Sequence, residues 1–331
     1  MKRLIDDYDA ALFDLDGVVY LGMEPVVGAV DGIAMLRKLG KKVGFVTNNS
    51  ARFPQTVVDH LVALGIPCTL EDVITSTQAS IRMMRREIHD GARILVCGSP
   101  ALATQLAEAG YQIVETWQEK PDAVIIGYDP KITWPRLDQA AIAIANGAKW
   151  FASNTDSTRP TAEGTVPGAG AIVAAVGLCV PDQQPMVAGK PYAPLLDLTV
   201  ERLSAKAPIF VGDRLDTDIE GAVGVGMDSF LVFTGTHGKR DLIEAVQDQR
   251  PTWIGADIRS MCQAPRQANL SGNTARCGCE EVQLIDSKLV LKTNPTGLEA
   301  QLDALWAGTQ LAWENERVDA EDFLVRLDEL H

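Results

Sequence analysis

Two carboxylates follow an apolar run near the start of the chain, in the stretch ALFDLDGVVY at residues 11–20. Asp14 and Asp16 stand two residues apart, and residues i and i+2 of a strand share one face. Two negative charges packed side by side are costly without a cation. A bound metal ion or a protonated carboxyl would relieve that cost, and either arrangement suits phosphate chemistry. The alternative is an edge strand with acidic residues at a turn.

Two further segments carry groups that could hold an anion. In VTNNS, at residues 46–50, Thr47, Asn48 and Asn49 follow an apolar run. A hydroxyl, two amides and turned backbone N–H groups at a strand end can cradle a phosphate. The alternative is an N-cap for the next helix, which Ser and Asn also favour. Lys190, in AGKPY, precedes a proline that could begin a helix, so it could neutralise a phosphate rather than lie in solvent as most lysines do.

A second acidic segment, VGDRLDTDIEGA, occupies residues 211–222. Asp213, Asp216 and Asp218 fall within six residues after a run that is typical of a buried strand. They could satisfy the dipole of the helix that follows. Alternatively Asp213 completes a magnesium site, because Mg²⁺ prefers hard oxygen ligands.

Short β-branched runs alternate with helical patterns along the chain, which predicts an α/β fold with a largely parallel sheet. In such sheets ligands bind at the carboxyl ends of the strands, where Asp14, Thr47 and Asp213 are expected. The expected strands are 11–15, 42–46, 73–75, 93–97, 123–126, 149–152, 208–211 and 229–232. The expected helices are 27–39, 54–64, 77–87, 100–109, 134–146 and 191–203.

The order of these elements indicates several domains. The segment between the second and third chemical motifs has strands and helices of its own, enough for a domain that could cover the site. Small and polar residues at 262–280 indicate a linker. After it come an expected hairpin and two helices. We therefore expect a core at 1–79 and 186–260, an inserted cap at 80–185, a linker at 261–280 and an α+β extension at 281–331.

Composition excludes some classes of protein. The chain has 331 residues and a formal net charge of −14, which disfavours a nucleic-acid binder because such proteins usually present a basic face. The longest apolar run, residues 168–180, is too short to cross a bilayer, and the N-terminus lacks a signal-peptide core. The six cysteines are scattered except for Cys277 and Cys279, which is weak evidence for zinc and fits free thiols. We expect a soluble, cytoplasmic protein without a membrane partner.

Taken together, the four motifs are more specific than each alone. DxDGxxY, then TNN, GKP and GDRxxTD, over residues 12–236, resemble the haloacid dehalogenase (HAD) superfamily and its nitrophenyl-phosphatase-like branch. That resemblance implies a Rossmann-like core with a parallel sheet and an inserted α/β cap of the C2 type. It also implies a Mg²⁺-dependent phosphatase that acts through an aspartyl-phosphate intermediate.

The resemblance further implies a role for each motif residue. Asp14 would be the nucleophile. Asp16 would protonate the leaving alcohol and then activate water, while its backbone carbonyl binds the metal. Thr47, Asn49 and the backbone of Asn48 would bind the phosphate, and Lys190 would neutralise the charge of the nucleophile and of the phosphoryl group. Asp14 and Asp213 would bind Mg²⁺, and Asp218 would bind the ion or orient its waters.

Selectivity would come from the cap. Arg159 could bind a second anionic group; the other cap candidates are Tyr128, Asp129, Asn154, Asp156 and Thr161. A C-terminal extension on this branch resembles the actinobacterial glycerol-3-phosphate phosphatases, whose extension looks like part of an acetyltransferase fold. Without a glycine-rich acyl-carrier loop, the extension here is expected to pack on the core or mediate assembly rather than transfer acyl groups.

The expected substrate is a small phosphorylated metabolite, first of all glycerol 3-phosphate. Pyridoxal phosphate, phosphoglycolate, a sugar phosphate and a nucleoside monophosphate remain alternatives. A regulatory or binding protein that acts through the extension is an alternative of another class. Pairing through the cap, common among relatives, implies a homodimer.

Overall fold

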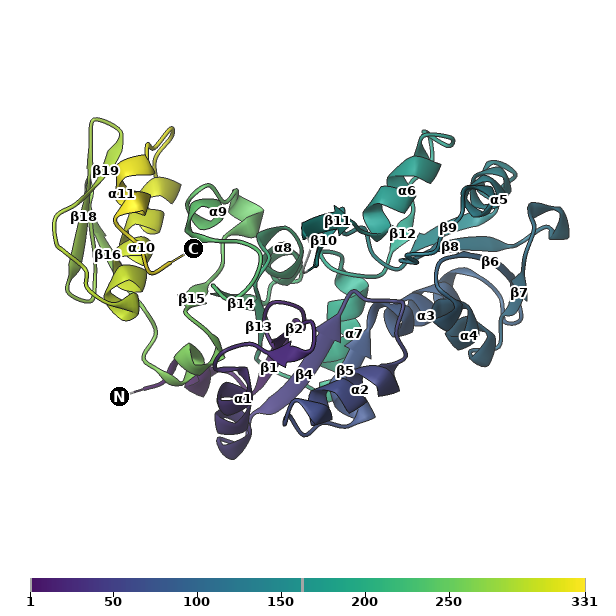
Figure 1. The fold of residues 1–331 in the computed structure, drawn as a ribbon, viewed down its shortest axis with the longest axis horizontal. Coiled ribbons are helices and arrows are strands. Elements are labelled where there is room, and N and C mark those ends of the chain that lie inside the picture. Colours follow the sequence, from purple (N-terminus) through teal and green to yellow (C-terminus); the bar gives the residue numbers. More distant parts are fainter. Residues whose placement is uncertain (1, 162–163, 331) are drawn as a thin grey trace. The chain divides into compact units, whose positions relative to one another are not determined.

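The computed structural model describes residues 2–161 and 164–330, except for the side chains of residues 160 and 161. The chain divides into two compact units (Figure 1). Unit 1 comprises Met1–Val43 and Ala205–His331, and unit 2 comprises Gly44–Ser204. Two distant stretches of sequence therefore build unit 1, and the chain between them builds unit 2.

Unit 1 is built on parallel strands in the order β15-β14-β13-β1. These strands are β1 (Ala10–Phe13), β13 (Pro208–Gly212), β14 (Asp228–Val232) and β15 (Trp253–Gly255). All four residues of β1 are buried, as expected for a parallel strand covered on both faces. The helices of this part are α1 (Ala29–Lys38), α8 (Glu220–Gly224) and α9 (Lys239–Ile243), and a short hairpin pairs β2 (Tyr20–Leu21) with β3 (Glu24–Pro25).

The C-terminal part of unit 1 is an antiparallel sheet with two helices (yellow in Figure 1). Its strands are β16 (Ala268–Ser271), β17 (Thr274–Cys277), β18 (Glu280–Ile285) and β19 (Lys288–Leu291), and its helices are α10 (Leu298–Trp313) and α11 (Glu321–Val325). The expected linker at 261–280 is wrong in this respect, because β16 and β17 lie inside it. The small residues taken as signs of flexibility, Ala275 and Cys277, are instead buried in the core.

This C-terminal module packs on the core of unit 1. One continuous apolar cluster joins residues of the parallel sheet and its helices to residues of the module; it includes Leu231, Phe233, Leu242, Ile254, Val282, Leu302, Leu305 and Trp306. The Trp313 indole donates to the Leu242 carbonyl (3.1 Å), and the Lys239 ammonium donates to the carbonyls of Leu327 and Leu330 (2.6 Å each). The module and the parallel sheet thus share one hydrophobic core. Of the two expected arrangements, packing on the core or mediating assembly, the structure shows the first.

Unit 2 begins within β4 (Lys42–Thr47), which pairs in parallel with β5 (Val73–Thr75). Its larger sheet has five parallel strands in the order β12-β9-β8-β6-β7. They are β6 (Arg93–Cys97), β7 (Gln112–Val114), β8 (Ala123–Ile126), β9 (Lys149–Ala152) and β12 (Met186–Val187). The helices are α2 (Pro54–Ala63), α3 (Ser76–Glu87), α4 (Pro100–Glu108), α5 (Trp134–Ala145), α6 (Ala169–Gly177) and α7 (Ala193–Leu203).

A hairpin of β10 (Thr158–Thr161) and β11 (Gly164–Pro167) projects from unit 2 just before α6. The strands expected from the sequence did not include this hairpin. The α/β architecture with parallel sheets is confirmed, whereas the boundaries expected for core and cap remain predictions. Among the described residues, no helix is both long and apolar enough to cross a bilayer.

Candidate active site

Strands β1 and β13 place two carboxylates at the same sheet edge. The two strands are adjacent and parallel, with Phe13 opposite Val211. The Asp14 backbone N–H continues the ladder by donating to the Val211 carbonyl (2.9 Å). Asp213 follows β13 directly, so both side chains emerge where the strands end.

Asp218 reaches the same point from the segment after β13. Residues Leu215–Ile219 form one turn of π-helix, a geometry that often occurs at functional sites. This turn brings the Asp218 carboxylate back to the strand end, where it accepts from the backbone N–H groups of Asp213 (3.2 Å) and Arg214 (3.1 Å). Asp216 points elsewhere and pairs with the Arg214 guanidinium (2.7 Å). Of the three aspartates in this motif, the structure brings Asp213 and Asp218 together at the strand end.

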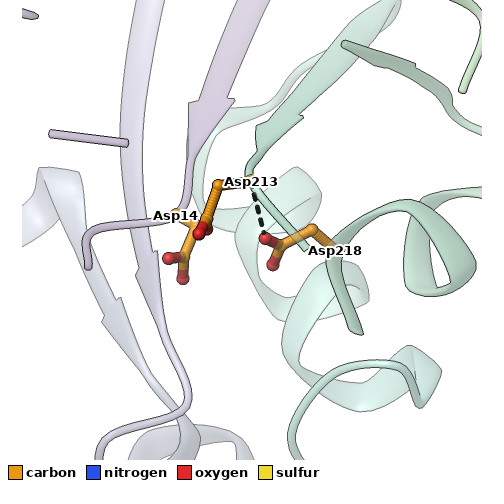
Figure 2. Close-up of side chains that lie close together, drawn as sticks. All are labelled: Asp14, Asp213 and Asp218. Atoms are coloured by element: carbon orange, nitrogen blue, oxygen red, sulfur yellow. Dashed lines mark hydrogen bonds between the residues drawn. The ribbon is translucent and has the colours of Figure 1, made fainter. Parts of the chain in front are cut away.

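The side chains of Asp14, Asp213 and Asp218 point toward one another (Figure 2). Each offers a carboxylate oxygen, and these oxygens lie within 4.8 Å of one another. We call these three residues the carboxylate cluster. Asp213 and Asp218 are fully buried, and Asp14 is half-buried. Three carboxylates in so little space repel one another unless a cation or a proton intervenes.

Asp213 shows that the cluster fits a cation. Its Oδ2 accepts from the Thr236 backbone N–H (2.6 Å). Its Oδ1 is buried and has no hydrogen-bond partner among the described residues. A buried carboxylate oxygen without a partner is costly. Hard oxygen donors of this kind are the ligands that Mg²⁺ prefers, so the donor set suits that ion.

Glycines make room for these carboxylates. A Cβ on Gly17 would lie 2.5 Å from Asp213 Oδ2, and Gly17 has φ +93°, a conformation that favours glycine. A Cβ on Gly235 would overlap the same oxygen, and one on Gly212 would overlap the Asp218 side chain. Sequence analysis named none of these three as site residues. Only the distances across the folded chain identify them.

Burial raises the pKa of Asp213 above its ordinary value of 3.8, and repulsion from the Asp218 carboxylate adds to the effect. The hydrogen bond from the Thr236 N–H opposes the shift because it stabilises the ionised form. A bound divalent cation would act against both causes of the rise. The carboxylate cluster therefore favours the binding of either a proton or a metal ion.

Asp16 lies outside the carboxylate cluster. Its side chain is exposed, whereas Asp14 two residues earlier is half-buried. The Gly17 N–H donates to the Tyr20 carbonyl (2.8 Å), which turns the chain back just after Asp16. An exposed carboxylate can exchange protons with water, as an acid–base group must.

The second and third motifs meet within unit 2. The Lys190 N–H donates to Asn48 Oδ1 (2.8 Å), and Asn48 Nδ2 donates to the Lys190 carbonyl (3.1 Å). Lys190 is 2% exposed, which is rare for a lysine. The motif predicts a role toward phosphate for Asn48, whereas the hold of its side chain on the lysine loop is visible only in the structure.

Thr47 and Asn49 shape the loop between these motifs. The Thr47 hydroxyl accepts from the Asn49 N–H (3.0 Å), and the Asn49 side chain accepts from the Ala51 N–H (2.9 Å). The alternative, that this segment caps the next helix, is wrong: α2 begins at Pro54, and its N-cap is Phe53.

Among the cap candidates, Arg159 and Tyr128 contact each other. Arg159 Nε donates to the Tyr128 hydroxyl (2.9 Å), and the guanidinium carbon lies 4.8 Å from the centroid of the tyrosine ring. Asn154 and Asp156 instead bond to Asn48, while Asp129 accepts from the Lys131 N–H two residues on. The side chain of Thr161 lies outside the described part of the chain.

Comparison with known proteins now decides the family. A model of haloacid dehalogenase-like hydrolases matches residues 11–112, and a model of HAD-hydrolase-like proteins matches residues 187–261. The chain is 42% identical over 263 residues to a D-glycerol 3-phosphate phosphatase of Mycobacterium tuberculosis, covering 80% of this chain and 73% of that one. This chain belongs to the HAD-like hydrolases.

Solved structures agree with this assignment. The crystal structure of a glycerol phosphate phosphatase from M. tuberculosis in complex with magnesium superposes with a TM-score of 0.84 at 34% identity. The likeness covers 99% of this chain and 98% of that one, so it includes the C-terminal module. A p-nitrophenyl phosphatase from Archaeoglobus fulgidus superposes with a TM-score of 0.72 at 27% identity, over 77% of this chain and 98% of that one. The resemblance drawn from the four motifs is confirmed.

Proposed function

We propose that this HAD-like hydrolase is a Mg²⁺-dependent phosphatase whose main substrate is glycerol 3-phosphate. The carboxylate cluster carries the proposal. Three carboxylates gather at the carboxyl end of a parallel sheet, and one buried oxygen of Asp213 has no hydrogen-bond partner among the described residues. Asp14, Asp213 and Asp218 would hold the ion, together with the backbone carbonyl of Asp16. The ion would supply positive charge against the phosphoryl oxygens.

In the first step, a carboxylate oxygen of Asp14 forms a bond to phosphorus, and the ester P–O bond breaks. Asp16 donates its proton to the departing oxygen, which leaves as the alcohol. In the second step Asp16, now ionised, takes a proton from water as the water attacks phosphorus. The bond between phosphorus and the Asp14 oxygen breaks, releasing inorganic phosphate and regenerating both carboxyl groups.

The TNN and GKP motifs would supply the groups that bind the phosphate. Lys190 would neutralise phosphoryl charge, and Thr47, Asn49 and the backbone of Asn48 would bind the phosphate oxygens. The burial of Lys190 and the two bonds from Asn48 to its backbone support this role, because they fix the loop that carries the charge. Arg159, held by Tyr128, would contact the rest of the substrate.

Two similarities favour glycerol 3-phosphate over other esters. The M. tuberculosis relative is a D-glycerol 3-phosphate phosphatase, and the solved glycerol phosphate phosphatase is similar over nearly the whole chain, extension included. Whole-length likeness supports shared specificity more strongly than the shared motifs do, since those motifs serve many substrates.

Phosphate release from a panel of esters tests the proposal. With Mg²⁺, purified protein is expected to show its highest kcat/KM on glycerol 3-phosphate, and chelation should abolish turnover. Asp14→Asn should abolish turnover with the fold retained. If no ester releases phosphate, the proposal that the protein is a phosphatase is refuted. If a sugar phosphate, a nucleotide, phosphoglycolate or pyridoxal phosphate is preferred, glycerol 3-phosphate is refuted as the main substrate.

We also propose a core at residues 1–79 and 186–260, a cap at 80–185 and pairing of two chains through the cap. A cytoplasmic location accords with six free cysteines, and the net charge of −14 argues against nucleic acid as a partner. Light scattering on the purified protein should give the mass of a dimer. A monomeric mass would exclude the pairing.

A further inference from the structure

The side-chain amide of Asn48 has every hydrogen-bonding group engaged. Its Oδ1 accepts from the Lys190 N–H (2.8 Å), and its Nδ2 donates both to the Lys190 carbonyl (3.1 Å) and to Asp156 Oδ1 (2.9 Å). An amide has one acceptor oxygen and two N–H donors, so its donor capacity is filled. Asn48 is 8% exposed, which leaves little water to replace a lost partner.

Only one orientation of this amide can hold the lysine loop. If the amide turned over, its NH₂ would face the Lys190 N–H and its oxygen would face the Lys190 carbonyl. Both contacts would be repulsive. An ionised carboxylate accepts hydrogen bonds and cannot donate them. Asp156 therefore favours the orientation in which NH₂ points toward it, which is the one that clamps Lys190.

Asp156 is itself fixed by its backbone. Its N–H donates to Asn154 Oδ1 (3.2 Å), and its carbonyl accepts from the Gly170 N–H (2.9 Å) at the start of α6. A Cβ at Gly168 would overlap the Asp156 carbonyl oxygen, so this approach needs glycine. The carboxylate is thus presented to Asn48 from a rigid support.

The Asn48 backbone is anchored as well. Its carbonyl accepts from the Ser76 hydroxyl and from Asn154 Nδ2, both at 2.7 Å. The loop around Gly189 comes so close that a Cβ there would lie 2.6 Å from Asn48 Oδ1. The backbones of Asn48 and Asp156 are both held in place. The orientation of the Asn48 side-chain amide is then the remaining variable.

We infer that Asp156 is a positioning residue for Lys190 and acts through the side-chain amide of Asn48. This inference rests on the proposed function, because it assumes that Lys190 serves phosphoryl transfer. Asp156 lies two residues before the β10 strand that carries Arg159. The same carboxylate therefore connects the hairpin expected to contact the substrate with the loop that carries the catalytic charge.

A double-mutant cycle tests this inference, with p-nitrophenyl phosphate and glycerol 3-phosphate as substrates and Mg²⁺ present. Asp156→Ala should lower kcat about tenfold, within the range for residues coupled in one hydrogen-bond network. Asp156→Asn keeps an acceptor oxygen and should stay within about threefold of wild type. In the Asn48→Ala background, Asp156→Ala should change kcat less than about twofold, because the relay is already broken. Asp182→Ala, an exposed aspartate of the same unit, is the matched control.

A readout independent of turnover completes the test. Hydrogen–deuterium exchange over residues 186–192 should accelerate in Asp156→Ala and stay close to wild type in Asp156→Asn. Additive losses of kcat in the cycle, or exchange unchanged by Asp156→Ala, would overturn the inference. If wild-type protein hydrolyses neither substrate, the proposed function fails, and the exchange result still decides whether Asp156 holds the Lys190 loop.

Discussion

Mg²⁺ is expected to stabilise this protein against heat, and Asp213→Asn should remove the effect. A ligand at one hundred times its Kd stabilises the folded state by about 2.7 kcal/mol. For a unit of this size, each kcal/mol corresponds to about 2–4 °C in Tm, so saturating Mg²⁺ should raise the Tm by roughly 5–10 °C. One Asp213 oxygen lacks a partner among the residues that the structure describes, and the Asp218 charge lies nearby. Both destabilise the metal-free cluster and therefore favour Mg²⁺ binding.

The effect should depend on pH with a definite sign. Burial and Asp218 raise the pKa of Asp213 above 3.8, so between 3.8 and the raised pKa the folded protein binds more protons than the unfolded chain does. Without metal, this group's contribution to stability therefore falls as pH rises through that window. Mg²⁺ competes with the proton, so the Tm gain should be larger at pH 8 than at pH 5.

Differential scanning fluorimetry with and without Mg²⁺ measures both effects. Asp213→Asn removes the charge but keeps an oxygen for the Thr236 N–H, so without metal it should be at least as stable as wild type. Its Mg²⁺ response should fall below about 1 °C. Asp216→Asn, a neighbouring acid outside the carboxylate cluster, should keep the full response. A full response in Asp213→Asn, or equal responses at pH 5 and pH 8, would refute the reasoning.

Three further outcomes are expected. Gly235→Ala should reduce phosphate release by more than tenfold, because the new Cβ would overlap Asp213 Oδ2. Gly177→Ala is the control: its Cβ would make only ordinary contacts, so activity in the same assay should be kept. Deleting residues 281–331 should leave the remaining chain insoluble or without a cooperative melting transition, because it removes more than half of a shared apolar core. A soluble, cooperatively melting product would contradict this expectation. Arg159→Ala should raise KM more than it lowers kcat, and Tyr128→Phe, which keeps the ring but loses the hydroxyl, should have a smaller effect of the same kind. Kinetics in which kcat alone falls would count against substrate contact.

Short-range sequence patterns were enough to predict the carboxylates that lie at strand ends. The positions of Asp14 and Asp213 follow from two apolar runs that end in acids, because parallel strands deliver their carboxyl ends to one edge. Strands such as Arg93–Cys97 and Ala123–Ile126 lie where their β-branched runs predict them. Asp218 could be assigned to the site only with the help of the motif, because a regular α-helix pattern does not predict the π-helical turn that brings this residue back to Asp213.

What the sequence could not predict depends on partners distant along the chain. Residues 262–280 have a composition typical of a linker, yet β16 and β17 form there because β18 and α10 cover them. Strand propensity is weak in such a segment, and burial against a neighbour decides the outcome. The contact between Asn48 and Asp156 spans 108 residues, and no spacing rule connects the two.

The carboxylate cluster and the Asn48–Asp156 pair are therefore two kinds of residue with different roles. The carboxylate cluster is destabilising by itself, and its cost is acceptable only if a cation offsets it. Asn48 and Asp156 add no charge at the reacting atoms. They hold the loop of the buried Lys190, because Asp156 favours one of the two possible orientations of the Asn48 amide. A motif search finds the first kind because the chemistry demands the residue type at a fixed spacing. The second kind follows only from counting donors and acceptors around a buried amide, where both N–H donors are used and a reversed amide would leave two repulsive contacts.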